Sequence, residues 1–497
     1  MDVFVSGVGM TRFGGLKESL EEIMARAAAL ALRDAGRETV DAIYLGVMNA
    51  EEFVGDSNFA ALLADTLGLT GVPSTRVETA SSTGAGVFEA AFYAVASGYL
   101  KNVLVLAGEK MTHLPTPKTT RILSEVIDRS ERRYGATMPA LAALVAQRYR
   151  QEHRLSLQKL GEILAQVAVK NHHNGSLNPN AQFRKEISVG DYFRSQMVSY
   201  PLRLYDCAPI TDGASAVILT SEPTKIKVSG IGHATDTSAV RHRASLTSFN
   251  STKEAALKAY TMARLNPPDI QFAEVHDAFT LFEIIGTEDL GFFPAGEGWK
   301  PLENGATRLR GSLPINPSGG LKSRGHPVGA SGLAQMVEIV WQLRGEAGQE
   351  RQLEKSEVGL AQSIGGLGNN NIVTILERSD RKRILAEGWE PDFHPEIKSL
   401  RKEVIPPPIE GRGSLETFTV LYATPEGFRS PLTLALVRAS GGELVMACNP
   451  DYRNPDELKM GQRVDLIMQE GLYVFEKKTV WDRLRSWWKK SRKTLFS

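Results

Sequence analysis

Short runs of consecutive apolar residues alternate with helical patterns over residues 1–225. Residues 102–107 are one such run, and strands that are apolar at every position are typical of a parallel sheet covered on both faces. Residues 226–378 repeat this pattern, and their first segment, 226–232, resembles residues 3–9 in sequence. The pattern predicts two related halves, each built from β-α-β units, that arose by an internal duplication.

A helical insertion and a further domain are expected outside this pattern. Residues 112–205 predict a long helical insertion in the first half, and the charged and proline-containing residues 379–410 predict a linker. Residues 411–478 change to short strand-like runs separated by Gly, Pro and Asn, which predicts a small β-barrel of the OB type. The five runs are residues 415–422, 432–437, 443–447, 463–468 and 472–476.

The last residues, 479–497, form a basic tail. Eight Lys and Arg residues follow position 476, interleaved with Trp481, Trp487 and Trp488. The spacing allows a basic amphipathic helix. Two interpretations stay open: a terminal helix that packs its tryptophans onto the body, or a segment that binds an anionic surface or a partner protein.

Composition and charge narrow the class of protein. The chain has 42% hydrophobic residues, 23% charged residues and a formal net charge of +1, which implies a globular protein with no general attraction to nucleic acid or membranes. The two cysteines, Cys207 and Cys448, exclude a disulfide-rich scaffold and a four-cysteine zinc site. No apolar run reaches the ~18 residues of a membrane span. The first residues enter a strand without a signal peptide, so we expect a cytoplasmic protein.

Residues 77–86 carry the most specific candidate chemistry. Their sequence, VETASSTGAG, predicts a strand that turns through small residues into a helix and presents Ser81 at the helix N-terminus. Backbone N–H groups and the helix dipole favour negative charge at that point. Serine is also a preferred residue at the N-cap of a helix. Ser81 is therefore either a nucleophile, or a residue of the helix cap and oxyanion hole.

This turn resembles the nucleophile turn of the thiolases, in which a cysteine precedes Ser-Thr-Gly or Ala-Ser-Gly. His276-Asp277, in place of Asn-Glu, resembles the sterol-carrier-protein-type and archaeal acetyl-CoA acetyltransferase branch of that family. The resemblance covers about 375 residues. Its other motifs, in the family's order, are GEKM at 108–111, KNHHN at 170–174, YDCAPITDGA at 205–214, HDAF at 276–279, NPSGG at 316–320, GHPVGASG at 325–332 and SIGGLG at 363–368.

The barrel segment 411–478 resembles a DUF35-type OB-fold domain, a small acyl-CoA-associated family that often accompanies thiolases. That family usually carries a zinc ribbon before the barrel, and the two cysteines of this chain cannot form one. The two resemblances together imply an α/β protein. Its thiolase part is a duplicated fold of α-β-α-β-α layers with a helical loop insertion, and a C-terminal β-barrel follows.

Chemistry next to a thioester needs hydrogen-bond donors for the oxygen of an enolate. The resemblance assigns this role to His326 with His276, and to the backbone N–H groups of Ser81 and the Gly365-Gly366 turn. The family's nucleophilic cysteine falls at Ser81 and its acid/base cysteine at Ser363. A serine hydroxyl needs a general base during attack, and His326 is the candidate. Ser363 is either an acid/base group or a structural, hydrogen-bonding residue.

Three basic residues are expected to bind the phosphate groups of CoA: Lys118, Arg121 and Arg184. His172 and His173 resemble a metal pair only in sequence, because adjacent residues of a helix face different ways. The resemblance implies a CoA thioester as substrate, with no covalently bound cofactor and no metal. It also implies a homodimer that acts in lipid metabolism, with a further protein of the acyl-CoA pathway as a candidate partner.

Three functions are consistent with the sequence. The first is a thiolase-like acyltransferase, of the acetyl-CoA C-acyltransferase type, that works through Ser81. The second is a lyase that cleaves a 3-hydroxyacyl-CoA by a retro-aldol reaction without a covalent intermediate, since that chemistry needs the enolate hole and no thiol. The third is an inactive subunit that binds or scaffolds acyl-CoA. Serine at both cysteine positions also fits a pair of Cys→Ser substitutions made in the laboratory.

Overall fold

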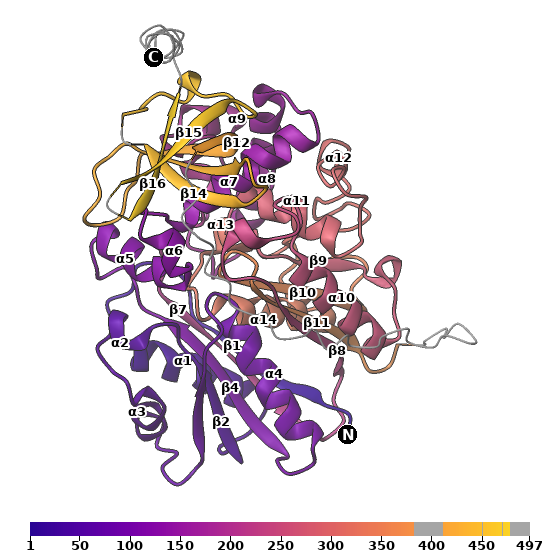
Figure 1. Ribbon diagram of the computed structural model, residues 1–497. Helices are drawn as coiled ribbons and strands as arrows, with labels where there is room; N and C mark the ends of the chain where they lie inside the picture. Colours follow the sequence, from indigo (N-terminus) through magenta and orange to yellow (C-terminus); the bar gives the residue numbers. More distant parts are fainter. Residues whose placement is uncertain (382–410, 450, 470, 478–497) are drawn as a thin grey trace, which may run out of the picture.

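The computed structural model describes residues 1–381, 411–449, 451–469 and 471–477, and Figure 1 shows its elements. The linker predicted at 379–410 lies almost entirely outside these residues, and the basic tail lies wholly outside them. The N-terminal half contains β1 (Phe4–Met10), α1 (Leu20–Asp34), β2 (Ala42–Gly46), α2 (Ala50–Phe53), α3 (Phe59–Thr66), β3 (Ser74–Val77), α4 (Thr83–Ala96), β4 (Asn102–Glu109) and β7 (Gly213–Thr220).

The C-terminal half repeats this plan. Its elements are β8 (Ile226–Thr235), α10 (Asn250–Ala263), β9 (Phe272–Glu274), α11 (Thr280–Asp289), α12 (Lys300–Glu303), α13 (Gly320–Arg324), α14 (Ser331–Arg344), β10 (Val358–Gly365) and β11 (Asn370–Arg378). The strand order is β3-β2-β4-β7-β1 in the first half and β9-β10-β11-β8 in the second, and β1 pairs with β8 where the halves meet. Counted outward from this junction, each half places its first strand, then its last strand, then the strand before the last (β1-β7-β4 and β8-β11-β10). The predicted duplication requires this shared order.

Helices lie outside and between the two halves of the sheet. The outer face of the first half packs against α1, and that of the second against α10. Helices α4 and α14 pack against each other in the middle layer, where they contact strands of both halves. The predicted α-β-α-β-α layering is therefore confirmed.

Glycines in the two related segments let the outer helices approach the strands closely. A Cβ atom on Gly7 of β1 would lie 2.3 Å from a carbonyl oxygen of α1, and one on the matching Gly230 of β8 would lie 2.2 Å from a carbonyl oxygen of α10. The next matching pair, Gly9 and Gly232, comes as close, at 2.5 and 1.9 Å. No side chain fits at these distances. The sequence likeness of residues 3–9 and 226–232 thus reflects one packing constraint met twice.

The prediction of a parallel sheet is wrong, because the sheet is mixed. Parallel pairs join β2 to β3, β2 to β4, and β9 to β10, whereas β7 and β11 run antiparallel to both of their neighbours. Only the short turn at residues 366–369 connects β10 to β11, and a connection of that length can join only antiparallel strands. Apolar runs show that a strand is buried on both faces and say nothing about its direction.

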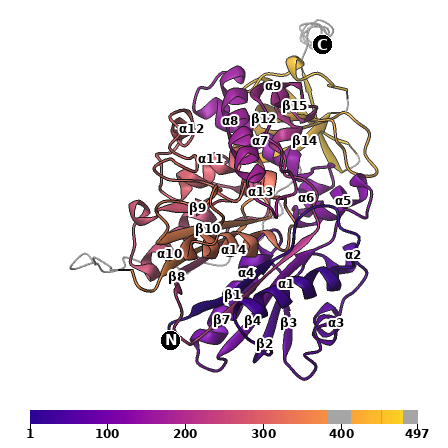
Figure 2. The ribbon, with the colours of Figure 1, turned by 180° about the vertical axis from the view of Figure 1, so that it is seen from behind.

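The helical insertion joins the body to the barrel. Its elements are α5 (Thr116–Leu123), α6 (Arg129–Arg132), α7 (Met138–Glu152), α8 (Leu157–Ser176), α9 (Val189–Arg194), β5 (Met197–Ser199) and β6 (Leu202–Arg203). Figures 1 and 2 both show α7 and α8 beside the barrel. Strand β5 adds to the barrel sheet where Ser199 pairs with Leu421, and the Thr417 hydroxyl donates to the Leu144 carbonyl (2.8 Å).

The C-terminal domain is a closed barrel of five strands, as predicted. The strands are β12 (Gly411–Leu421), β13 (Leu432–Ala439), β14 (Leu444–Asn449), β15 (Arg463–Gln469) and β16 (Leu472–Lys477). Their order is β13-β14-β16-β15-β12, and the pairing of β12 with β13 closes the ring. Among the described residues no helix is both long and apolar enough to cross a membrane.

Leucines of β13 fill the interface between the barrel and α7. Leu434 is fully buried in a core that it shares with residues of α7. We expect Leu434→Ala to lower the free energy of unfolding by about 2–5 kcal/mol, because it opens a cavity in this shared core. Denaturant unfolding measures the change. The control Arg438→Ala, at an exposed position of the same strand, should change stability by less than about 1 kcal/mol. If Leu434→Ala lowered the free energy of unfolding as little as Arg438→Ala does, the barrel and α7 would not share a packed core.

Candidate active site

The nucleophile turn is a strained segment held by hydroxyl groups. Ala80 has a φ of 56°, in the left-handed region that residues with a side chain seldom adopt. The Thr83 hydroxyl donates to the Ala80 carbonyl (2.6 Å) and accepts from the Thr79 N–H (2.9 Å). The Ser82 hydroxyl donates to the Thr79 carbonyl (2.6 Å). These bonds fix the half-buried Ser81 at the entrance of α4.

Ser81 is not the N-cap of the helix, which corrects one of its two interpretations. The N-cap of α4 is Ser82, and the side chain of Ser82 turns back to Thr79 and makes no capping bond. No hydrogen bond of the Ser81 hydroxyl occurs among the described residues. The hydroxyl is therefore available to a ligand.

Two glycine segments from the C-terminal half press against this turn. A Cβ on Gly84 would lie 2.9 Å from the Gly329 carbonyl oxygen, and a Cβ on Gly365 would lie 2.5 Å from the Thr79 carbonyl oxygen. A Cβ on Gly332 would lie 2.7 Å from Oγ of Ser363. The segment after His326, the residue Ser363 and the glycine loop at 365–368 therefore meet at the start of α4.

Ser363 has an unsatisfied hydroxyl. It lies on β10, is 1% exposed, and its Oγ has no hydrogen-bond partner in the described part of the chain. A buried hydroxyl without a partner is unfavourable by about 1–3 kcal/mol. Its position beside Gly332 places this unused polar atom next to the helix that begins at the nucleophile turn.

His276 and His326 lie side by side, with ring centroids 5.3 Å apart and ring planes nearly perpendicular. Nδ1 of His276 accepts from the Ile364 N–H (3.3 Å), so the ring proton lies on Nε2 and can be donated. Nδ1 of His326 lies 2.7 Å from the Ser331 hydroxyl, which donates its single hydrogen to the Pro327 carbonyl (2.9 Å). That network assigns the His326 proton to Nδ1 and leaves Nε2 able to accept one.

Both histidines are neutral at physiological pH. Burial and then the charge of Arg324 lower the pKa of His326 to about 3. Burial, the neighbouring His326 and Arg324 hold the pKa of His276 well below its ordinary value. One ring can therefore donate and the other accept without a change of protonation across the physiological range.

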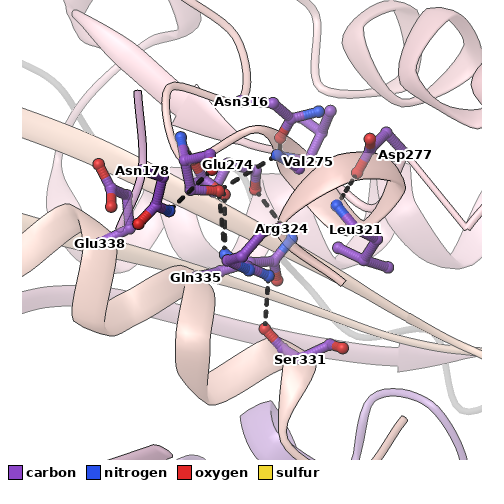
Figure 3. A network of polar contacts seen from close by, with 12 residues as sticks. Asn178, Glu274, Val275, Asp277, Asn316, Leu321, Arg324, Ser331, Gln335 and Glu338 are labelled. Atoms are coloured by element: carbon purple, nitrogen blue, oxygen red, sulfur yellow. Dashed lines mark hydrogen bonds and ion pairs between the residues drawn. The ribbon is translucent and has the colours of Figure 1, made fainter. Parts of the chain in front are cut away.

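A buried ion pair positions the two rings. Nη1 of Arg324 lies 3.1 Å from Oε2 of Glu274, and neither side chain is exposed. Glu274 precedes His276 by two positions, and Arg324 precedes His326 by two positions. The contact between Glu274 and Arg324 therefore holds the two histidine rings at a fixed distance from each other. The Ser318 hydroxyl (2.6 Å) and N–H (2.8 Å) complete the hydrogen bonds of the carboxylate. Figure 3 shows this network, with Ser331 below it, where the Ser331 carbonyl accepts a hydrogen bond from Nη2 of Arg324 (3.4 Å).

The KNHHN motif supports the same loop, and its two histidines bond to different residues. Lys170 pairs with Glu283 (2.9 Å), and the Asn171 amide donates to Asp277 (2.7 Å). The Asn174 amide donates to the Asn316 carbonyl (2.9 Å). His172 and His173 each contact a different residue, Lys185 and Glu186 respectively. No group of three or more potential metal ligands occurs within the described ranges.

Glu109 is a site residue that sequence reasoning did not single out. Its carboxyl accepts N–H bonds from Met48 and Gly329 (3.0 Å each), and burial raises its pKa well above the ordinary value. Its carboxyl group therefore ties the turn after His326 to the segment at Met48. The GEKM motif contains the residue, but only the fold shows that Gly329, 220 positions later, is its partner.

The basic residues predicted to bind CoA do not form one cluster. Lys118 and Arg121 lie on α5, where Arg121 pairs with Glu52 (2.8 Å) and Glu125 (3.0 Å). Arg121 also borders a cavity of 520 Å³ between the insertion and the barrel, with Arg129 and Arg132. Arg184 is exposed beside Phe183, whose ring stacks on that of His172. No described contact joins Arg184 to the other two.

Three known protein families match segments of this chain. The family described as "Thiolase, N-terminal domain" matches residues 3–223, and "Thiolase C-terminal domain-like" matches residues 232–378. The family "ChsH2, C-terminal OB-fold domain" matches residues 407–469. The chain belongs to the thiolase family and carries a C-terminal OB-fold domain of the ChsH2/DUF35 type.

Relatives and solved structures agree with this class. An acetyl-CoA acetyltransferase of Methanothermobacter thermautotrophicus is 43% identical over 389 residues, which are 76% of this chain and 100% of the relative. Sterol carrier protein 2 of Bos taurus is 34% identical over 396 residues, which are 76% of this chain and 72% of the relative.

Two solved structures share the fold. A monomeric SCP2-thiolase like protein type 1 from Mycobacterium smegmatis matches with a TM-score of 0.75 and 16% identity, over 96% of this chain and 99% of its own. An Ltp2-ChsH2(DUF35) aldolase matches with a TM-score of 0.64 and 21% identity, over 77% of this chain and 99% of its own. The predicted resemblance to thiolases with a fused OB-fold domain is confirmed.

The low pKa values of the two site histidines predict their behaviour in solution. We expect the ring signals of His276 and His326 to stay unchanged between pH 5 and 8 in NMR spectra, because both rings remain neutral. His233 is the internal control, since its hydrogen bond to Glu89 raises its pKa above the ordinary value of about 6.5. The variants His276→Gln and His326→Gln assign the signals. A titration of either site histidine near pH 6.5 would contradict the burial argument.

Proposed function

We propose that this protein transfers acyl groups from CoA thioesters through Ser81. One observation carries the proposal: a proton-accepting and a proton-donating histidine lie side by side, and the turn after His326 packs against the nucleophile turn. Membership of a family whose relatives include acetyl-CoA acetyltransferases supports the substrate class.

In the first step the Ser81 hydroxyl oxygen attacks the thioester carbonyl carbon while its proton passes to Nε2 of His326. The tetrahedral intermediate then collapses, the carbon–sulfur bond breaks, and CoA leaves as the thiol after taking the same proton. The acyl group remains on Ser81 as an oxygen ester. A second CoA thiol then attacks the ester carbonyl carbon, the bond to the Ser81 oxygen breaks, and the thiol proton passes through Nε2 of His326 to restore the hydroxyl. When the enolate of a second CoA thioester attacks instead, Nε2 of His326 takes the proton from its C2 and returns it to the Ser81 oxygen.

The other site groups act on the developing negative charge. Nε2–H of His276 and the backbone N–H groups at Ser81, Gly365 and Gly366 donate to an oxyanion or enolate oxygen. Donors of this kind are worth about 2.7–4 kcal/mol each in the transition state. Ser363 supplies a hydrogen bond rather than a base, because no group beside its hydroxyl in the described structure takes a proton from it.

A second function, retro-aldol cleavage of a 3-hydroxyacyl-CoA, is favoured by a specific observation. The donor and acceptor histidines are complete, although both thiols are replaced by hydroxyls. In this reaction Nε2 of His326 takes the proton of the 3-hydroxyl group, the bond between C2 and C3 breaks, and the resulting enolate takes a proton at C2. The shared fold with an Ltp2-ChsH2(DUF35) aldolase is consistent with this alternative.

The remaining sequence predictions belong to this proposal. The phosphates of CoA would bind Lys118, Arg121 or Arg184 at the entrance of the active site. A homodimer would form through β3, because that strand lies at the outer edge of the sheet and is only partly buried. An inactive acyl-CoA-binding subunit is the outcome if neither reaction occurs.

Intact-protein mass after incubation with a panel of acyl-CoAs separates the functions, with free CoA and cleavage products measured in the same samples. Acyl transfer predicts an adduct on the wild-type chain that is absent from Ser81→Ala. Products without an adduct, which persist in Ser81→Ala and disappear in His326→Ala, would establish the lyase instead. Neither adduct nor product, with acyl-CoA still bound, would leave a binding subunit.

Restoring the thiol tests the nucleophile position directly. We expect Ser81→Cys to raise the rate of acyl transfer by at least about tenfold, because a thiolate forms readily at a helix N-terminus beside a histidine and its acyl-thioester is more electrophilic than an oxygen ester. Release of CoA measures the rate. The control Ser82→Cys changes the adjacent buried serine and should not raise it. An unchanged rate in Ser81→Cys would show that position 81 does not face the thioester.

A further inference from the structure

Arg243 is a buried cation with unused hydrogen-bond donors. Its Nε and Nη2 atoms are enclosed by protein, and neither has a hydrogen-bond partner among the residues that the structure describes. Burial lowers the pKa of Arg243 to about 10, and the guanidinium still carries its charge at neutral pH. Unpaired donors of a buried charge are costly, so native structures seldom retain them without a function.

The two unused atoms form one edge of the guanidinium. Nε–H and Nη2–H point in the same direction and are spaced to meet the two oxygen atoms of a carboxylate. A single oxygen atom can accept from both groups only in a forked arrangement with bent hydrogen bonds. The spacing of the two donors therefore matches a carboxylate best.

No neighbouring carboxylate fills this role. Glu131 is already bonded to the Val240 N–H (3.2 Å) and the Arg241 N–H (3.1 Å), and its pair with the Arg241 guanidinium spans 3.5 Å. Asp236 acts on Arg243 only through its charge, and its own bond is to the Thr237 N–H (2.7 Å). Both acidic residues offset the positive charge from a distance and leave the donor edge open.

The ring of Phe249 lies between Arg243 and the glycine loop of the active site, residues 365–368. The guanidinium carbon of Arg243 lies 5.8 Å from the centre of the Phe249 ring. On the other side, a Cβ on Gly368 would lie 2.4 Å from Cδ1 of Phe249, so the ring contacts the loop that follows Ser363. The Ser251 hydroxyl donates to the Gly368 carbonyl (2.6 Å) and ties the helix after Phe249 to the same loop.

The barrel closes this region from the far side. The short 3-10 helix Val240–His242, directly before Arg243, packs against β14 of the barrel, and Val240 shares a core with Met446. Arg243 as a whole is half-buried, but its Nε and Nη2 atoms are enclosed. The guanidinium therefore lies between Phe249, which contacts the glycine loop, and the 3-10 helix that packs against the barrel.

We propose that Arg243 binds a carboxylate at the far end of the acyl chain, so that the preferred substrates are CoA thioesters of dicarboxylic acids. This inference rests on the proposed function for the place of the thioester. It assigns to the barrel a role in shaping the acyl end of the site, and it makes Arg243 a specificity-determining residue rather than a catalytic one.

The test compares two ligands of equal length, adipyl-CoA and hexanoyl-CoA, by calorimetric titration. Both are saturated six-carbon thioesters, and the Ser81→Ala background prevents acylation. We expect adipyl-CoA to bind roughly tenfold more tightly, or better, because two charge-assisted hydrogen bonds form only with its carboxylate. Arg243→Gln should bring the two affinities together, and Arg243→Lys should keep part of the difference.

Arg241→Gln is the matched control, since it removes a neighbouring positive charge whose donors are already used by Ser130 and Glu131. It should leave the preference for adipyl-CoA unchanged. Thermal unfolding of each variant checks folding, and Arg243→Lys remains informative if Arg243→Gln does not fold.

Each outcome has a distinct meaning. Equal affinities in the parent, or a preference that survives Arg243→Gln, would overturn the role of Arg243 and leave the proposed function standing. A preference lost equally in Arg241→Gln would show a general charge effect and would also overturn it. Binding of neither thioester would overturn both proposals together.

Discussion

The buried ion pair between Glu274 and Arg324 is the contact on which the site depends. Removing two charges from water costs free energy. Their mutual attraction offsets this cost only when the remaining lone pairs of the carboxylate also accept hydrogen bonds. Ser318 and Arg324 provide those donors for Glu274. Because His276 and His326 each follow an ion-pair residue by two positions, the same contact fixes the two rings 5.3 Å apart. Loss of one partner would leave an isolated charge and free both rings at once.

The ion pair also sets the chemistry of the rings it holds. Burial lowers the pKa of both rings most, and the positive charge of Arg324 lowers it further. Neutral rings can take opposite roles, and their second hydrogen-bond partners, Ile364 and Ser331, decide which ring donates and which accepts. These hydrogen bonds are complete in a thiolase fold that has serine at positions 81 and 363, and both proposed reactions use the same donor and acceptor rings.

Much of the fold could be predicted because local constraints repeat along the chain. The glycines at 7 and 230 appear in related segments since a helix backbone presses on each strand. The barrel strands were visible from short apolar runs separated by turn residues, and the structure places all five close to their predicted positions. Strand direction was not predictable from apolar runs. The N-cap position, which was one of the interpretations of Ser81, is taken by Ser82.

The sequence by itself determined which chemical groups the site contains: two histidines, two serines and the glycine turns are each marked by a short motif. Tertiary structure alone decided how those groups act. The proton position on His276 depends on Ile364, and the carboxyl group of Glu109 is held by the N–H groups of Met48 and Gly329, all far away in the sequence. The Arg243 donors are enclosed only by the folded chain. Hydrogen bonding and burial are properties of contacts, and contacts between distant segments exist only once the chain has folded.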